Sequence, residues 1–140
     1  LLSELLMGAR RTDDDWVAVG ADMVVVDTLV HKLLDRTGIL TVMDSEHAYG
    51  PGCYGARGCE AVLRELAPTI DAALVNRTYP SAFPRYVQKA VWAFAAQSDH
   101  NFCNAAQVGR GRWCAIAGQC PVGDLCRLGG GVALSAVDRI

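Results

Sequence analysis

The sequence predicts an all-α fold that carries a cysteine-rich loop near its C-terminal end. Apolar residues recur at helical spacing in several stretches, and no stretch shows the apolar–polar alternation typical of a strand. Four of the six cysteines lie between Cys103 and Cys126. We therefore expect three parts: a helical domain over 1–102 with a loop insertion at 44–59, a cysteine-rich loop over 103–128, and a flexible tail over 129–140.

The composition is that of a globular chain. Of its 140 residues, 51% are hydrophobic and 20% are charged, which is enough for a core and excludes a disordered chain. A net charge of −2 gives no overall basic field, so any contact with nucleic acid must come from a local patch. No apolar run is long enough to cross a bilayer, and no basic segment precedes the first leucines as in a signal peptide. We interpret the chain as the C-terminal part of a longer cytoplasmic protein with no membrane partner.

Two helices are expected before residue 27. Residues 1–7 predict a short apolar helix end in which Leu2, Leu5 and Leu6 share one face, with Gly8 as its stop. Thr12 and the three acids after it predict the start of a second helix, since acids suit the positive end of the helix dipole.

The clearest helix prediction covers residues 28–37. Asp27 is a natural N-cap, because its carboxylate can accept hydrogen bonds from the free amides of the first turn. Gly38 is a natural residue to follow the last turn. His31 lies off the apolar stripe of this helix or at its edge, so we interpret it as a surface or satisfied residue and not as a ligand.

Three further helices are expected downstream. They cover Cys59 to Ala67, Thr69 to Val75 and Arg85 to Gln97, and Pro84 suits the first turn of the last one. In the last helix the predicted inward residues are Val87, Ala90, Val91, Phe94 and Ala95.

The segment 44–59 is rich in glycine and predicts a loop after a turn that contains His47. It holds the two remaining thiols, Cys53 and Cys59. These cysteines either pair with each other, add ligands to a metal site, or are inert, since pairing cannot be deduced from sequence.

The four C-terminal cysteines predict a metal site formed by Cys103, Cys114, Cys120 and Cys126. Clustered thiolates hold Zn²⁺ or an iron–sulfur cluster. The intervals between them contain ten, five and five residues, so the tight Cys-x-x-Cys pairs of a zinc ribbon are absent and the metal is not identified. Two disulfides or four buried free thiols are the alternatives.

Several of these features resemble the C-terminal half of the endonuclease III-like helix–hairpin–helix DNA glycosylases. The resemblance rests on Val26-Asp27-Thr28, the Arg36-Thr37 pair that follows, a helix ending at Pro68, a tryptophan-bearing helix, and the C-terminal cysteines. It covers roughly residues 23–126, and 44–59 would be an insertion. Only the Cys120–Cys126 interval has the family's spacing, and the hairpin motif is not recognisable before Asp27.

The resemblance implies roles for particular residues. Asp27 would be the catalytic carboxylate, and the four C-terminal cysteines would hold a 4Fe-4S cluster. Arg110 and Arg112 would contact the phosphates of double-stranded DNA. Arg11 stands nearest the position of the family's lysine nucleophile and cannot form a Schiff base, so an active enzyme would be a DNA N-glycosylase without lysine-dependent lyase chemistry.

Two function classes therefore compete, beside a third reading as a disulfide-linked helical domain from an oxidising compartment. One is a DNA-binding, repair-type glycosylase fragment with an iron–sulfur cluster, associated with the nucleoid and either active or inactive. The other is a non-catalytic helical module that is stabilised by a Zn²⁺ ion and binds protein or nucleic acid. The sequence leaves the oligomeric state open.

Overall fold

The computed structural model describes residues 2–8, 14–104, 114 and 116–126. These residues form helices and connecting loops and contain no strand element, as the all-α prediction requires. The α-helices are α1 (Leu2–Gly8), α2 (Asp14–Asp22), α3 (Thr28–Arg36), α4 (Ile39–Val42), α5 (Cys59–Leu66) and α6 (Pro84–Ala95). Single 3-10 turns are η1 (Pro51–Tyr54), η2 (Ala67–Thr69), η3 (Ala72–Leu74), η4 (Ala117–Gln119) and η5 (Gly123–Leu125). None of these helices combines the length and apolar character that crossing a bilayer requires.

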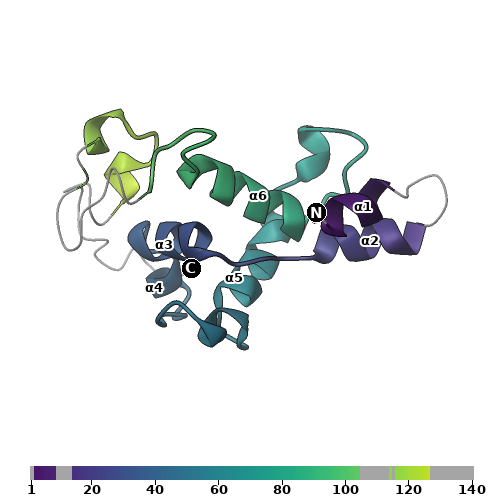
Figure 1. Cartoon of the computed structure of the whole chain (residues 1–140), viewed down its shortest axis with the longest axis horizontal. Coiled ribbons are helices and arrows are strands. Elements are labelled where there is room, and N and C mark those ends of the chain that lie inside the picture. Colours follow the sequence, from purple (N-terminus) through teal and green to yellow (C-terminus); the bar gives the residue numbers. More distant parts are fainter. Residues whose placement is uncertain (1, 9–13, 105–113, 115, 127–140) are drawn as a thin grey trace.

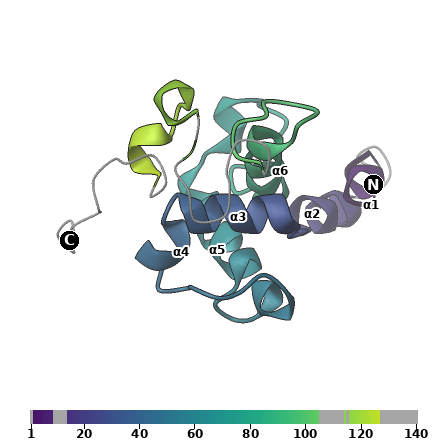
Figure 2. The same cartoon turned by 60° about the vertical axis from the view of Figure 1, so that its left-hand side comes forward.

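The helix α3 lies at the centre of the molecule. Figure 1 shows α1 and α2 at one end and the turns η4 and η5 at the other, with α3 to α6 between them. In Figure 2 α3 crosses the middle of the view, with α6 above it and α5 below it. The main core therefore forms where α3, α5 and α6 meet, and its largest fully buried side chains are Val30, Leu34, Leu40, Val62 and Leu63.

Both ends of α3 form as the sequence predicts. One carboxylate oxygen of Asp27 accepts hydrogen bonds from the backbone N–H groups of Leu29, at 3.0 Å, and Val30, at 2.9 Å. At the other end Gly38 has φ 80°, in the left-handed region that glycine adopts without steric cost. The chain therefore turns sharply at Gly38 and continues directly into α4.

Most of the apolar face of the first helix is exposed, and only Leu6 of its three leucines is half-buried. Leu2 and Leu5 are 57% and 63% exposed, whereas Ser3 is buried and its hydroxyl donates to the Gly20 carbonyl at 2.9 Å. A Cβ atom at Gly20 would lie 2.9 Å from the Ser3 carbonyl oxygen. Helices α1 and α2 thus pack through small residues at close range, and that contact determines which side of α1 is buried.

Two downstream predictions also need correction. The expected helix over 69–75 is replaced by η2 and η3, because Asp71 interrupts the helix and caps η3 by accepting from the Ala73 N–H at 3.1 Å. In α6 the predicted core residue Ala90 is exposed, and Gln88 is buried. The Gln88 side-chain oxygen accepts from Arg85, which satisfies the buried amide oxygen.

Candidate metal centre

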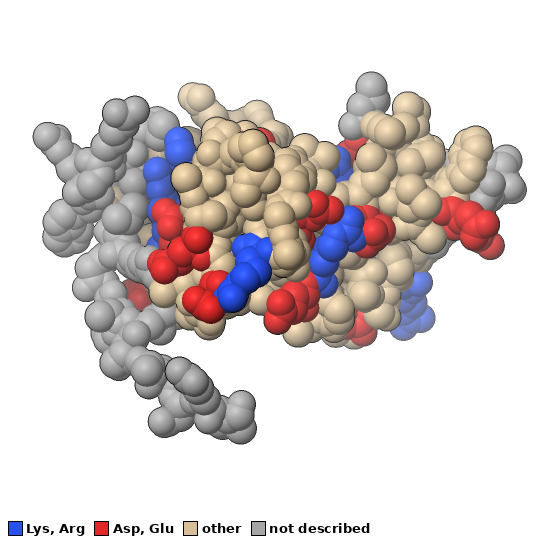
Figure 3. Space-filling view, turned by 90° about the horizontal axis from the view of Figure 1, so that it is seen from below, with Lys and Arg blue, Asp and Glu red and all other residues tan. Residues whose placement is uncertain are grey.

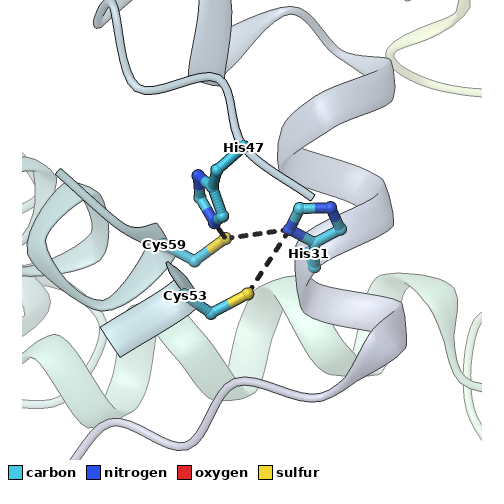
Figure 4. Close-up of side chains that lie close together, drawn as sticks. All are labelled: His31, His47, Cys53 and Cys59. Atoms are coloured by element: carbon cyan, nitrogen blue, oxygen red, sulfur yellow. Dashed lines mark hydrogen bonds between the residues drawn. The ribbon is translucent and has the colours of Figure 1, made fainter. Parts of the chain in front are cut away.

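Four side chains that can bind a metal ion converge between α3 and α5. They are His31 in the middle of α3, His47 in the loop after α4, Cys53 in η1, and Cys59, which begins α5. Their donor atoms all lie within 4.8 Å of one another. Figure 4 shows the side chains pointing toward a common centre. Across the described ranges of the chain, this is the one group of such side chains drawn together so closely.

The separations between nitrogen and sulfur match those around a single tetrahedral ion. The Cys59 Sγ atom lies 3.3 Å from His31 Nδ1 and 3.4 Å from His47 Nε2, and Cys53 Sγ lies 3.6 Å from His31 Nδ1. Zinc–sulfur and zinc–nitrogen bonds of about 2.3 and 2.05 Å at a tetrahedral angle place the two donors about 3.6 Å apart. The donor positions therefore leave room for one ion.

The loop that brings Cys53 and Cys59 together depends on a close backbone contact at Gly58. A Cβ atom there would lie 2.3 Å from the Gly52 carbonyl oxygen and 2.4 Å from that of Cys53. Only glycine therefore allows the chain to fold back so closely before α5 begins. The N–H of Val62 then donates to the Gly58 carbonyl at 3.0 Å, which starts the helix with Cys59 in its first turn.

His47 is oriented by a hydrogen bond of the kind that supports metal ligands. Its Nδ1 atom lies 2.6 Å from the Ser45 carbonyl oxygen, so a neutral ring donates from Nδ1. Its Nε2 atom then presents a lone pair toward Cys59 Sγ. Metal-binding histidines commonly donate their other N–H to a carbonyl in this way.

Burial controls the protonation of the metal-free group. Cys53 and Cys59 have no exposed surface, and His31 is 8% exposed. Burial raises the pKa of Cys59 to about 12, because the thiolate loses its hydration. The charge of Cys53 and a hydrogen bond with that residue raise this pKa as well. Burial and the nearby His47 lower the pKa of His31, which favours its neutral imidazole. A cation that binds Cys59 must therefore displace the proton of that thiol.

Sequence reasoning missed half of this group. His31 is buried against Cys59 and is not a surface residue, and its place in the cluster makes it a candidate ligand. His47 was placed only in a turn. For Cys53 and Cys59, which are free thiols, the arrangement is compatible with a role as metal ligands. The available signal was the regular interval His47-x5-Cys53-x5-Cys59 within a glycine-rich loop.

The four C-terminal cysteines come together at a second place. Cys103, Cys114, Cys120 and Cys126 all line a small cavity of about 20 Å³, and all but Cys120 are buried. Each is a free thiol. These sulfurs do not form as compact a group as the His/Cys set, and a zinc ion or an iron–sulfur cluster at this place stays a prediction.

This cysteine group is attached to the C-terminal end of α3. The Arg36 guanidinium donates to the Cys103 carbonyl at 3.3 Å and lies 3.5 Å from its sulfur. The Cys126 thiol donates to the Arg36 carbonyl at 3.4 Å. Burial raises the pKa of the Cys103 thiol, and the positive charge of Arg36 opposes that shift. Helix α3 thus carries one member of the first group, His31, and contacts the second group through Arg36.

The remaining predicted site residues are separate from both groups or lie outside the described residues. Asp27 is half-buried and caps α3, which confirms its predicted structural role and leaves its catalytic role a prediction. Arg110 and Arg112 lie outside the described residues. Figure 3 shows acidic and basic side chains interspersed on one face, so that face presents no continuous patch of either sign.

Comparison with protein-family models, curated proteins and solved structures finds no match to this chain. The resemblance to helix–hairpin–helix glycosylases therefore remains a prediction from a few short motifs.

Proposed function

We propose that this chain is a helical binding module whose fold a structural Zn²⁺ ion holds together at His31, His47, Cys53 and Cys59. The observation that carries the proposal is the convergence of four donor atoms within 4.8 Å. Two nitrogen and two sulfur ligands in a tetrahedral arrangement are typical of structural zinc sites. Four protein ligands leave no open position for water or substrate, so the ion's role is structural.

The choice of zinc over a two-iron cluster follows from how the donors are mixed. In a cluster held by two histidines and two cysteines, the histidines bind one iron and the cysteines bind the other. Here Cys59 Sγ lies within 3.4 Å of a nitrogen of each histidine. That mixing favours one ion shared by all four ligands. Magnesium and calcium prefer oxygen ligands and do not suit thiolates.

The ion would connect four segments that are far apart in the sequence. Its ligands come from α3, the loop after α4, η1 and α5, and both cysteines lie in the main core cluster. Structural zinc in small domains contributes an apparent ~10–16 kcal/mol, which is comparable to the ~5–15 kcal/mol of a whole domain's stability. Zinc binding would therefore supply a large share of the stability of this part of the chain.

The experiment that tests this proposal measures zinc content and the spectrum of the cobalt-substituted chain. The full chain is expected to retain about one zinc ion at this centre. Cobalt in a tetrahedral site with two thiolates gives intense visible bands. The double variant Cys53→Ser/Cys59→Ser should lose both the ion and the bands, whereas His100→Gln, which changes an exposed histidine outside the centre, should keep them. Unchanged zinc content in the double variant would overturn the proposal.

A second candidate function is favoured by the cavity that the four C-terminal cysteines line. That cavity abuts one end of α3, and Asp27 caps the other end. In a DNA-binding, glycosylase-like protein, Cys103, Cys114, Cys120 and Cys126 would hold a 4Fe-4S cluster or a second zinc ion. Asp27 would stabilise the positive charge that develops on the sugar as the base leaves, and Arg110 and Arg112 would bind phosphates.

This second candidate is tested by analysing anaerobically purified protein. Iron together with acid-labile sulfide, lost in Cys120→Ser, supports the cluster. Binding to double-stranded DNA that weakens with salt, and weakens less steeply in Arg110→Ala/Arg112→Ala, supports the phosphate contacts. Zinc alone, with no binding to DNA, would exclude this candidate and leave the zinc-stapled module.

A further inference from the structure

The residue after the ligand Cys53 holds the backbone just before α3. The Val26 N–H donates to the Tyr54 hydroxyl oxygen at 3.0 Å, and that hydroxyl lies 3.3 Å from the Val26 carbonyl oxygen, to which it can donate. One hydroxyl group thus satisfies both backbone groups of a residue 28 positions away. Val26 is 5% exposed, so these groups have little access to water.

The C-terminal end of the same segment is held by His31, a member of the metal centre. The His31 N–H donates to the Asp27 carbonyl at 3.1 Å, in the first turn of α3. Its imidazole points to the two cysteine sulfurs (Figure 4). The backbone from Val26 to His31 is therefore fixed at one end through Tyr54 and at the other through His31, and Asp27 lies between them.

The position of Tyr54 depends on Cys53 more than on its own packing. Its side chain belongs to a residue that is 52% exposed, and η1 contains one buried residue, Cys53. A four-residue 3-10 turn has too few internal hydrogen bonds to be stable alone. Anchoring of Cys53 by an ion would therefore hold Tyr54 against Val26.

We propose that Tyr54 couples occupancy of the metal centre to the position of Asp27 at the start of α3. Tyr54 is a positioning residue, and the group that it positions is the carboxylate of Asp27, which caps α3. When the centre is filled, the Tyr54 hydroxyl fixes the Val26 backbone and hence the direction of the Asp27 side chain. When the centre is empty, η1 loosens and this constraint is lost. The inference rests on the proposed zinc site, because it needs an ion at Cys53.

The test is amide hydrogen exchange in the full zinc-loaded chain, resolved by residue with NMR, for the wild type and Tyr54→Phe. The variant removes only the hydroxyl and all four ligands remain, so zinc content should be unchanged. Loss of one hydrogen bond should speed exchange at Val26 by roughly 2- to 10-fold, with smaller increases at Leu29 and Val30. Amides of α6, such as Val91, should not change. Tyr79→Phe, which removes a hydroxyl from a separate aromatic cluster, is the matched control.

The outcomes separate this inference from the zinc proposal. A wild-type chain that binds no zinc would overturn the zinc site and the coupling with it. If zinc binds and Tyr54→Phe keeps wild-type protection at Val26, the zinc site stands and the coupling is wrong. Zinc removal from the wild type should raise exchange at Val26 further than Tyr54→Phe does, and equal exchange with and without zinc would also overturn the coupling.

Discussion

The Nδ1 atom of His31 lies 3.3 Å from the sulfur of Cys59, although 28 residues separate them in the sequence. His31 belongs to a helix that is buried in the core, and Cys59 begins the next long helix of that core. The contact therefore joins two core helices through a pair of metal-binding atoms. Five predictions follow from this centre and from the helix that carries it.

Zinc removal should lower the stability of the whole chain. A ligand at 1,000 times its dissociation constant adds about 4 kcal/mol to folding, and about 1 kcal/mol shifts the melting temperature of a chain this size by roughly 3 °C. We therefore expect EDTA to lower the melting temperature by on the order of 10 °C or more, and added zinc to restore it. The measurement is thermal unfolding followed by circular dichroism. Identical melting with and without zinc would contradict a structural ion.

Zinc binding should strengthen as pH rises from about 6 to 8. Burial raises the pKa of Cys59 to about 12 in the metal-free chain, so zinc must displace its proton. Each proton released increases the apparent affinity about tenfold per pH unit, and two thiols would give about 100-fold. Competition with a zinc-binding dye at several pH values measures this slope. A slope of zero would mean that no thiol binds the ion.

The metal-free chain should show the opposite trend at high pH. The Cys59 pKa is raised from an ordinary value of 9.0 to about 12. A group with a raised pKa contributes stability that is fully present below its unfolded pKa and is lost as pH rises toward its folded pKa. In EDTA, unfolding by urea should therefore become easier from about pH 9 upward. The test compares urea midpoints at pH 8 and pH 10, and a higher midpoint at pH 10 would refute it.

Gly58→Ala should disrupt the loop between Cys53 and Cys59. The added methyl group would lie 2.3 Å from the Gly52 carbonyl oxygen, so the backbone must move and the two sulfurs separate. Overpacking of this kind costs about 1–3 kcal/mol, which corresponds to a loss of zinc affinity of roughly 5- to 150-fold. Gly118→Ala is the control, because a Cβ atom there meets nothing within 4 Å. Equal zinc affinity in both variants would show that the close approach at Gly58 is not needed.

Substitutions at Asp27 should separate its capping role from any role of its charge. Asp27→Ala removes the acceptor for the Leu29 and Val30 amides and should cost about 0.5–2 kcal/mol in urea unfolding. Asp27→Asn keeps an acceptor and should cost only a few tenths of a kcal/mol. If the Asn variant is nearly as stable as wild type yet loses base release from DNA in the full protein, the charge has a catalytic role. Equal base release would leave Asp27 as a cap alone.

The sequence by itself determined where the central helices begin and end, because those ends depend on local chemistry. Asp27 accepts hydrogen bonds from residues two and three positions away, and Gly38 adopts its positive φ without help from distant residues. Pro84 opens α6 for the same local reason. The grouping of Cys103 to Cys126 was also visible, since those residues are close along the chain.

Only the tertiary structure decided which faces and which donors meet. Helical periodicity gives the direction of a side chain relative to its own helix and says nothing of which element packs there. Leu2 and Leu5 are exposed because α1 contacts α2 through Ser3 and Gly20 instead. His31 is a candidate ligand because the fold places the loop that ends at Cys59 beside its helix, and a contact across 28 residues leaves no local trace in the sequence.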